Sequence, residues 1–406
     1  MIGKLLSLQA VSAFRYPGFS YLFMASVLSF LGRYMMLVGL GWLVLEITNS
    51  SVSLGLVWAI SALPNLLFGV LAGVVIDKFD RRQLIIWAFI IIAVGAFLIG
   101  LLSSKNALQL WHILLVSFMM GSAATVGLPA RQAFTVDIVG PGNAMNAISV
   151  STAGTRIIGL FSGALAGVVI ELLGVEWCFY IMGLSYVSAS LIVLRIHRRV
   201  MEPPPRRQTI RDSYVTTLRL ITKNKIVLAL VLTASICEVF GFSYPVVLPI
   251  FARDILAIGA VGLGMFYAAE SLGGLLGGLV LASLGDYRHK GWLILCTVLS
   301  LGVFLVLFSQ TSWHLLSLFF MAMLGASTAV IDAMEHTILQ LNVPDDQRGR
   351  VMGIWMMSIG FGPVGRILIG VVAALLGVQL AVSINGIVMI AIFFLLVALV
   401  PKLRRA

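Results

Sequence analysis

The chain has 406 residues, of which 60% are hydrophobic and only 11% are charged, and its mean hydropathy is +1.07. Soluble globular domains carry about 25% charged residues, so this composition excludes a soluble globular protein. It indicates a chain that crosses a membrane repeatedly. The net charge of +11 is explained by a basic surface that faces anionic lipid, and it requires no nucleic acid partner.

Charged residues and Pro or Gly breaks divide the chain into twelve apolar runs. Each run has the ~20 residues that a helix needs to cross the ~30 Å hydrocarbon core of a bilayer. They lie near residues 19–46, 52–76, 83–103, 109–135, 143–173, 176–196, 226–252, 260–284, 291–309, 313–341, 348–376 and 379–400. The predicted fold class is therefore an all-α membrane protein with twelve transmembrane helices.

The positions of Lys and Arg predict the orientation, because cytoplasmic loops retain basic residues. Of the 27 basic residues we assign 22 to one side of the membrane, Arg131 among them. Lys105 and Arg253 fall on the opposite side, and the other three lie inside spans. Both termini are then expected in the cytoplasm.

One long polar interruption separates six spans from the next six. It contains the run Pro203–Pro205, which forbids helix, and then Thr209, a candidate cap for a short helix with one apolar face. We predict an N-terminal six-helix bundle at 1–194, a cytoplasmic linker with a short interfacial helix at 195–225, and a C-terminal six-helix bundle at 226–406.

The two halves repeat each other, as in transporters built from two bundles of the same orientation. With a shift of 203 positions, three glycines of the first half coincide with glycines of the second half: Gly159 with Gly362, Gly167 with Gly370 and Gly174 with Gly377. The segment at 71–82 is echoed at 281–290. We therefore expect two pseudo-symmetric bundles with a central cavity between them.

The segment Gly73–Gln83, GVVIDKFDRRQ, resembles the loop between the second and third helices of the major facilitator superfamily. Segments at 41–51, 63–82, 128–134 and 338–353 resemble the branch that contains the enterobactin exporter and the macrolide efflux pumps. The resemblance covers nearly the whole chain. It implies the major facilitator fold, a monomer, and a location in the bacterial cytoplasmic (inner) membrane.

The resemblance also implies a gating role for the loop that contains Asp77. This residue can accept hydrogen bonds from Arg81 or from free amides at the N-terminus of another helix, and such a cluster can hold one conformation and break in another. Gly73 is expected to let two helices approach closely, and Asp286 repeats Asp77 in the second half. A topogenic loop with a solvated ion pair is compatible with the same residues.

Ionisable side chains lie inside six of the predicted spans. A charge at the membrane centre costs from ~2.5 to over 10 kcal/mol, so such residues are expected to face a wet cavity or a partner. They are Arg33, Arg156, Glu238, Glu270, Asp332, Glu335 and Arg366. The third, sixth, ninth and twelfth spans carry none in their interior, and in the major facilitator fold these are the outer helices.

The buried charges are divided by sign, because Arg33 and Arg156 belong to the first half and the four acids to the second half. Opposite charges across a cavity can pair in a closed state and separate on opening. A carboxylate in a low-dielectric site favours its neutral form, so it can exchange a proton. Glu238 and Glu270 are the foremost candidates for proton carriers, and permanent salt bridges to the arginines are the alternative.

Asp332, Glu335 and His336 lie within five residues of one another, and Asp332 shares a helical face with His336. They are candidates for a proton relay or for capping the polar end of their helix. No ligand pattern completes a metal site, the three single cysteines indicate neither a disulfide frame nor a metal site, and no cofactor is expected.

Aromatic residues that share a face with a buried charge are candidates for lining a site for an amphipathic substrate. We select Tyr34, Phe242, Tyr267 and Trp355, together with the arginines Arg33, Arg156 and Arg366. The arginines suggest a substrate with an anionic or zwitterionic group. Packing between membrane helices is the competing interpretation of the aromatic residues.

Two departures from the family pattern bear on the mechanism. Drug and proton antiporters of this superfamily tend to carry an Arg in the fourth span four residues before a Gly, and here Ser117 precedes Gly121 at that distance. The Gly-Pro step expected in the fifth span is Gly159-Leu160. Both departures weaken the expectation that protons are coupled through the fourth span.

The favoured function is a secondary active transporter that works by alternating access, with proton-coupled efflux of an amphipathic small molecule such as a drug or siderophore. A facilitator or importer, or a carrier of lysolipid-type molecules, is the alternative. An enzyme is not expected, because the sequence has no Gly-rich phosphate loop, catalytic-triad spacing or metal signature. The expected partners are the small-molecule substrate, protons and the lipid bilayer, without nucleic acid.

Overall fold

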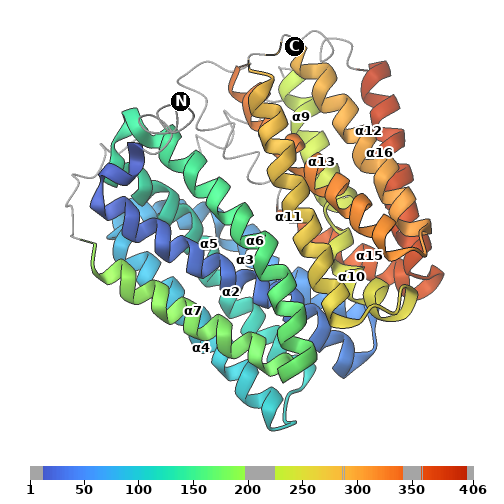
Figure 1. The fold of residues 1–406 in the computed structure, drawn as a ribbon. Helices are drawn as coiled ribbons and strands as arrows, with labels where there is room; N and C mark the ends of the chain where they lie inside the picture. The colour runs from blue at the N-terminus through green and yellow to red at the C-terminus, as the bar shows by residue number, and fades with distance from the viewer. Residues whose placement is uncertain are drawn as a thin grey trace, which may run out of the picture. The chain divides into compact units, whose positions relative to one another are not determined.

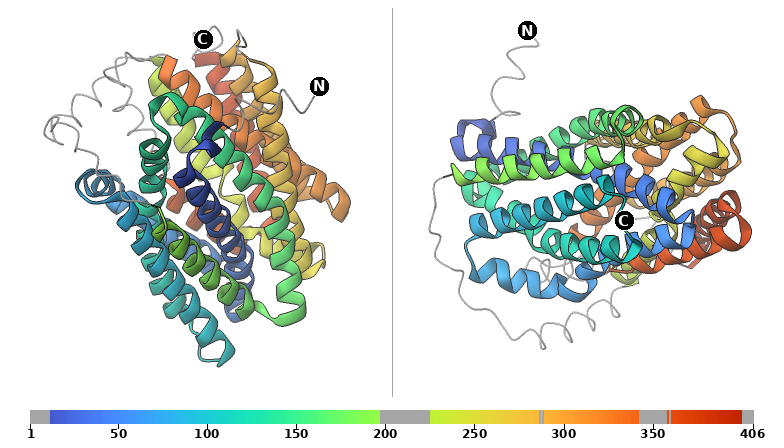
Figure 2. Two further views of the ribbon diagram at one scale, coloured as in Figure 1. Left: turned by 60° about the vertical axis from the view of Figure 1, so that its left-hand side comes forward. Right: turned by 90° about the horizontal axis from the view of Figure 1, so that it is seen from below.

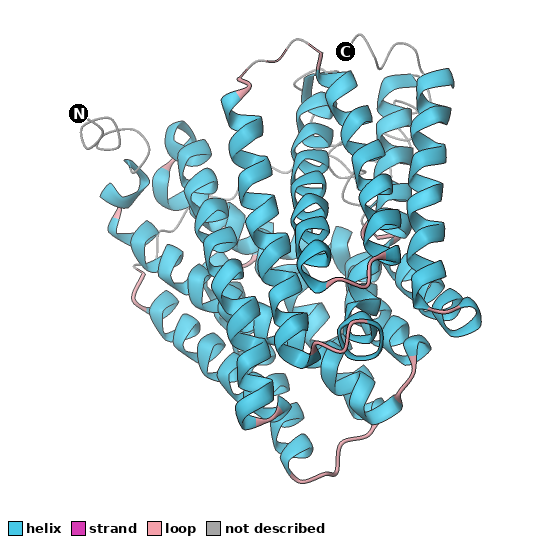
Figure 3. Cartoon of the chain, turned by 45° about the vertical axis from the view of Figure 1, so that its right-hand side comes forward, coloured by secondary structure: helices cyan, strands magenta, loops and turns pink. Residues whose placement is uncertain are grey.

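The structure is a computed structural model that describes residues 12–196, 225–285, 287, 289–341, 358 and 360–399. Within these ranges the chain forms helices joined by short loops, and no strand occurs (Figure 3). Eleven of the described helical segments are long and apolar enough to cross a membrane, and one apolar helix, at Gly362–Leu376, is shorter. The predicted all-α membrane fold is confirmed, and twelve spans agree with this count.

The first half of the chain contributes six long helices. They are α2 (Pro17–Thr48), α3 (Ser51–Lys78), α4 (Arg81–Ser104), α5 (Leu110–Val139), α6 (Ala144–Leu173) and α7 (Val175–Leu194). Two 3₁₀-helical turns, η1 (Ser12–Arg15) and η2 (Pro141–Asn143), precede α2 and α6. Each helix begins and ends within four residues of the predicted span.

The second half contributes five long or moderately long helices and one interrupted span. The helices are α11 (Gly259–Ser283), α12 (Lys290–Gln310), α13 (His314–Leu341), α15 (Gly362–Leu376) and α16 (Val378–Leu399). The interrupted seventh span consists of α9 (Lys225–Ile236), η3 (Cys237–Gly241), η4 (Tyr244–Val247), α10 (Leu248–Ile250) and η5 (Phe251–Ile255). In this span η3 and η5 are π-helical, whereas η4 is 3₁₀-helical.

Prolines account for the interruption of the seventh span. A proline has no amide N–H to donate, and its ring clashes with the carbonyl four residues earlier. Pro245 and Pro249 stand four residues apart. Just before them, the amide of Phe242 donates to the carbonyl of Cys237 at 2.7 Å, five residues earlier, which makes the π-helical turn. That turn carries Glu238, and such bulges are frequent at functional sites.

The helices group into two compact units. Unit 1 comprises Met1–Thr48, Leu63–Pro204 and Ala260–Ala268. Unit 2 comprises Asn49–Ala62, Pro205–Gly259 and Ala269–Ala406. The first part of α3 thus belongs to unit 2, and the first turns of α11 belong to unit 1. Most of the linker expected at 195–225, including its interfacial helix, lies outside the described residues, so the division into two bundles and a linker stays a prediction.

One equivalent pair of helices packs together in each unit. In unit 1, α4 runs along α7, and α2 packs on α6 and α7 (Figures 1 and 2). In unit 2, α12 runs along α16 and also packs on α13. The pair α4 and α7 corresponds to the third and sixth spans, and the pair α12 and α16 corresponds to the ninth and twelfth spans. The four spans without interior charges therefore pair with each other inside their units.

Glycines related by the sequence repeat lie at close helix crossings. In unit 1, a Cβ on Gly167 of α6 would lie 2.5 Å from the carbonyl oxygen of Ala260 in α11. In unit 2, a Cβ on Gly370 of α15 would lie 2.6 Å from the carbonyl oxygen of Ser51 in α3. The Ser51 hydroxyl also donates to the Gly370 carbonyl at 2.9 Å. Small residues let membrane helices approach closely, and here the repeat is visible in the packing.

Candidate functional site

Unit 2 contains a cluster of ionisable side chains from three spans. Glu238 on η3 interacts electrostatically with Arg366 of α15 and with Asp332 of α13. A Cβ on Gly362 would lie 3.2 Å from Oε2 of Glu238 and 3.8 Å from Nη2 of Arg366, so the carboxylate and the guanidinium approach the same point. In an interior of low dielectric, a nearby positive charge strongly stabilises an ionised carboxylate.

Arg366 is positioned by the first part of α3. Its Nη1 donates to the carbonyl of Trp58 at 3.0 Å. Gly55 packs directly on the Arg366 carbonyl and leaves no room there for a side chain. With the shift of 203 positions, the counterpart of Arg366 in the first half is Gly163, which packs on Gly264 of α11 in the same way. Arg366 therefore adds a charge where the repeat has no side chain.

Glu270 has a fixed hydrogen-bond donor. The hydroxyl of Tyr244 donates to Oε1 of Glu270 at 3.0 Å, and Tyr244 is only 1% exposed. The helix that carries Glu270, α11, crosses α13 in direct backbone contact. Gly325 of α13 faces the Glu270 carbonyl, and Gly273 of α11 faces the Ala322 carbonyl, without space for a Cβ at either glycine. The close crossing fixes the position of the Glu270 backbone.

The other two predicted proton carriers lie near the π-helical turn. Glu335, Glu238 and Asp332 all interact electrostatically with Cys237, so the three acids gather around this turn. Glu335 is 2% exposed, whereas Asp332 is only partly buried. Because α13 continues to Leu341, more than one turn beyond Glu335, these acids lie within the helix and not at its described end.

The interior charges of unit 1 are basic. Arg33 of α2, Arg131 of α5 and Arg156 of α6 all lie within spanning helices. Among the described residues, no carboxylate lies within 4.0 Å of any of these three guanidinium groups. Arg33 and Arg131 interact electrostatically with each other and with Tyr186 of α7. Unit 1 therefore contains positive charge that this part of the chain does not neutralise.

Arg131 lies within a long helix and contacts α2, and its assignment to the cytoplasmic side stays a prediction. Helix α5 continues for two turns beyond it, to Val139. Its Nη1 donates to the Ser29 hydroxyl at 2.8 Å, and its guanidinium carbon lies 5.2 Å from the centre of the Phe30 ring. The apolar residues Ala130, Phe134 and Ile138 continue at helical spacing past Arg131, and this pattern in the sequence is a signal that the helix continues.

The start of α4, directly after the loop that follows α3, forms an ion pair with α5 that the sequence did not reveal. Nη1 of Arg81 lies 2.5 Å from Oδ1 of Asp137, at the end of α5. Asp77, the predicted partner, is 4.0 Å from Nη2 of Arg81, and its side chain is 65% exposed against 12% for Asp137. Nothing in the described part of the chain lies within 4 Å of a Cβ built on Gly73, so the expected close helix approach is not seen there.

The remaining predicted site residues fall in different places. Tyr34 lies on α2 in unit 1, and Tyr267, which is 3% exposed, lies on the part of α11 that belongs to unit 1. Phe242 follows η3 in unit 2 and is partly buried. Trp355 and Asp286 lie outside the described residues. The gating and substrate-binding roles of all these residues stay predictions.

The helical fold and the charged residues inside its spans are those of a membrane transport protein, and the family match over nearly the whole chain makes it a member of the major facilitator superfamily. The sequence profile described as "Transmembrane secretion effector" matches residues 8–405, and the chain belongs to this family. It is 26% identical over 390 residues to the Staphyloferrin A transporter of Staphylococcus aureus, covering 95% of this chain and 96% of that protein. It is 25% identical over 388 residues to the Enterobactin exporter EntS of Citrobacter koseri, covering 93% of this chain and 92% of that one.

Solved structures share the fold at low sequence identity. A bacterial homolog of the human lysosomal transporter Spinster, in an inward-facing and unoccupied conformation, matches with a TM-score of 0.74 and 14% identity over 97% of this chain and 99% of that chain. The nucleoside transporter NupG matches with a TM-score of 0.71 and 18% identity over 94% of this chain and 98% of that chain. At these identities the likeness shows the fold alone.

Proposed function

We propose that this transporter is a proton-coupled exporter of an amphipathic small molecule of the siderophore or drug type. It works by alternating access in the bacterial cytoplasmic membrane, with both termini in the cytoplasm. The names of the two relatives, a siderophore transporter and a siderophore exporter, support the substrate class and the direction. The basic residues concentrated on one side of the predicted spans support the orientation.

The observation that carries the proposal is the environment of Glu238. It occupies a π-helical turn in the middle of a spanning segment, next to Arg366 and close to a second acid, Asp332. An ionised carboxylate there is stabilised by the arginine, and a protonated one is favoured by the low dielectric and by the neighbouring acid. Glu238 can therefore exist in both states, and its protonation removes a negative charge that interacts with Arg366.

Glu270 provides a second protonation site in the same unit. The Tyr244 hydroxyl donates to it from a buried position, so the carboxylate has a partner that does not depend on Arg366. We assign Glu238 and Glu270 as the proton carriers, with Asp332 and Glu335 as groups through which a proton can reach Glu238.

Transport by purified protein in proteoliposomes tests this assignment. With an imposed pH gradient, we expect the wild type to move iron-free staphyloferrin A, iron-free enterobactin or ethidium. Glu238→Gln and Glu270→Gln should each lose more than about tenfold of this driven transport, because a removed protonation site adds about 1.4 kcal/mol or more to the coupled step. Binding of the same compound should stay measurable.

Glu171→Gln is the matched control, because Glu171 is an exposed acid near the end of α6 and should transport at the wild-type rate. If both Glu238→Gln and Glu270→Gln pump at the wild-type rate, the proton-carrier assignment is wrong.

A facilitator is the second candidate function. The proximity of Arg366 to Glu238 favours it, because a permanent ion pair would keep the carboxylate ionised throughout the cycle. Transport that proceeds equally fast without any pH gradient, and unchanged in Glu238→Gln, would select this alternative.

A further inference from the structure

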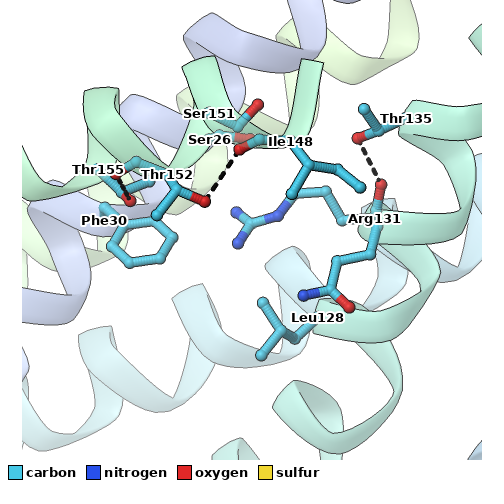
Figure 4. A pocket seen from close by; sticks show the side chains of 10 residues that line it. Ser26, Phe30, Leu128, Arg131, Thr135, Ile148, Ser151, Thr152 and Thr155 are labelled. Atoms are coloured by element: carbon cyan, nitrogen blue, oxygen red, sulfur yellow. Dashed lines mark hydrogen bonds between the residues drawn. The ribbon is translucent and has the colours of Figure 1, made fainter. Parts of the chain in front are cut away.

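Arg131 borders a cavity that lies entirely within unit 1. Helices α2, α5 and α6 line it, and its volume is about 110 Å³. Figure 4 shows the Arg131 side chain extending into this space, with its guanidinium group between Phe30 and Leu128. Pockets for whole drug-sized ligands are about 300 Å³ or larger, so this cavity has room for one polar group of a ligand.

The guanidinium group is oriented by the protein and still has donors to offer. Of its five N–H groups, one donates to the Ser29 hydroxyl, and this is the one hydrogen bond that the described residues make with it. The Phe30 ring lies against the guanidinium at 5.2 Å from its centre. These contacts fix the plane of the guanidinium group without neutralising its charge.

Other groups around the cavity complement an anion. The side-chain amide of Gln132 and the hydroxyl of Ser151 line the cavity, and neither is engaged by another described residue, so both can donate. Thr152 and Thr155 donate their hydroxyl hydrogens to backbone carbonyls of α6. Arg33 adds a second positive charge close enough to interact with Arg131. Two like charges in a low-dielectric region repel each other, and an anion bound at Arg131 relieves that repulsion.

We propose that the cavity formed by α2, α5 and α6 binds a carboxylate group of the transported molecule through Arg131. A planar carboxylate accepts two parallel hydrogen bonds from a guanidinium group, which matches an arginine held in one plane. The apolar part of the substrate extends out of the cavity, because the cavity accommodates only its polar end. This inference rests on the proposed function, since it names the chemical class of the exported molecule.

Binding to the full-length protein in nanodiscs of phosphatidylcholine tests the proposal. The probes are matched pairs that differ only in charge: 3-phenylpropionate, 4-phenylbutyrate and 6-phenylhexanoate, each with its neutral amide. Isothermal titration gives the affinity ratio of acid to amide for every pair. We expect the wild type to prefer the carboxylate about tenfold or more in at least one pair, the size of effect that a charge-assisted hydrogen bond contributes.

Variants assign that preference to Arg131. In Arg131→Gln the ratio should fall to about one. Arg131→Lys keeps the charge but loses the planar pair of N–H donors, so its ratio should lie between that of Arg131→Gln and that of the wild type. Ser29→Ala removes the hydrogen bond that orients the guanidinium and should also reduce the ratio. It is the substitute test if Arg131→Gln does not fold, because the alanine is a small change that should leave the fold intact. Lys105→Gln removes a positive charge from an exposed position in the same unit and should keep the wild-type ratio.

Two results would overturn the proposal. One is that no pair shows a carboxylate preference, and the other is that the preference is unchanged in both Arg131→Gln and Ser29→Ala. A lipid phosphate has the same anionic chemistry, so the titrations are repeated with phosphatidylglycerol in the nanodiscs. Arg131-dependent stabilisation by phosphatidylglycerol, without a carboxylate preference, would assign the cavity to lipid instead. Because binding is measured without transport, loss of proton coupling would refute the proposed function and leave this inference standing.

Discussion

Arg81 shows how the position of a side chain decides which of two carboxylates it pairs with. Asp77 precedes it by four residues, at the end of α3, and its side chain is mostly exposed, whereas Asp137 comes from α5 and is largely covered. Exposed ion pairs contribute about 0–1 kcal/mol, and a short, partly buried pair that is also a charge-assisted hydrogen bond contributes more. The ion pair with Asp137 therefore joins the start of α4 to the end of α5.

Substitution of each carboxylate tests this pairing. Asp137→Asn should lower the free energy of unfolding by about 1–2 kcal/mol, because it leaves the partly buried Arg81 without its charged partner. Asp77→Asn should change it by less than about 0.5 kcal/mol. Thermal unfolding of the two variants in the same detergent measures the difference. Equal shifts would mean that the pair with Asp137 is not the stronger one.

Which residues could be found from the sequence depends on what their chemistry requires. Glu238, Glu270 and Arg366 stand out as candidates because a charge inside an apolar run is visible without any tertiary structure. Arg131 does not stand out in this way, because the sequence analysis assigns it to the cytoplasmic side, and Asp137 lies beyond residue 135, where the predicted span ends, whereas α5 extends to Val139. Their partners, Ser29 and Arg81, lie on other helices, and no local pattern specifies such a pairing.

Among the described helices of unit 2, α11 crosses α13 in direct backbone contact. Gly273 and Gly277 of α11 face Ala322 and Ala326 of α13, and Gly325 faces the backbone of Glu270. Glycines four residues apart form one small-residue stripe along α11, which lets the helix backbones touch. Because Glu270 lies on this stripe, its position depends on the crossing.

Substitution of single glycines on α11 tests the crossing. Gly273→Ala should destabilise the protein by about 1–3 kcal/mol, because the new methyl group collides with the Ala322 carbonyl and the helices must separate. Gly278→Ala is the control on the same helix, since no atom lies within 4 Å of its Cβ position. It should be neutral or stabilising by up to about 1 kcal/mol, through helix propensity. Similar unfolding temperatures for both variants would contradict the close crossing.

Hydropathy located most elements to within a few residues, and Gly174 and Gly377, where α6 and α15 end with positive φ, are visible in the sequence repeat. The seventh span was predicted as one run, but it contains two π-helical turns and a 3₁₀ turn. Pro245 and Pro249 were present in the sequence as a signal of irregular backbone. Hydropathy measures only the length of an apolar run, so it cannot specify how the hydrogen bonds shift around a proline.

The charges inside the spans differ in sign between the two units. The described part of unit 1 carries arginines within its spans, and that of unit 2 carries four acids together with Arg366. In the proposed cycle the two groups have different tasks: the acids of unit 2 exchange protons, and the arginines of unit 1 hold an anionic substrate. We expect a transporter with this division of charge to move substrate and protons in one coupled cycle.

Simultaneous measurement of substrate and proton movement tests this coupling most directly. Proteoliposomes are loaded with iron-free staphyloferrin A or ethidium and with a pH-sensitive dye, the membrane potential is clamped with potassium and valinomycin, and the vesicles are diluted into substrate-free buffer at equal pH. We expect the lumen to acidify as the substrate leaves, because protons enter in exchange, and we expect no such acidification in Glu238→Gln. Departure of the substrate with no more change in lumenal pH than in protein-free liposomes would contradict the account.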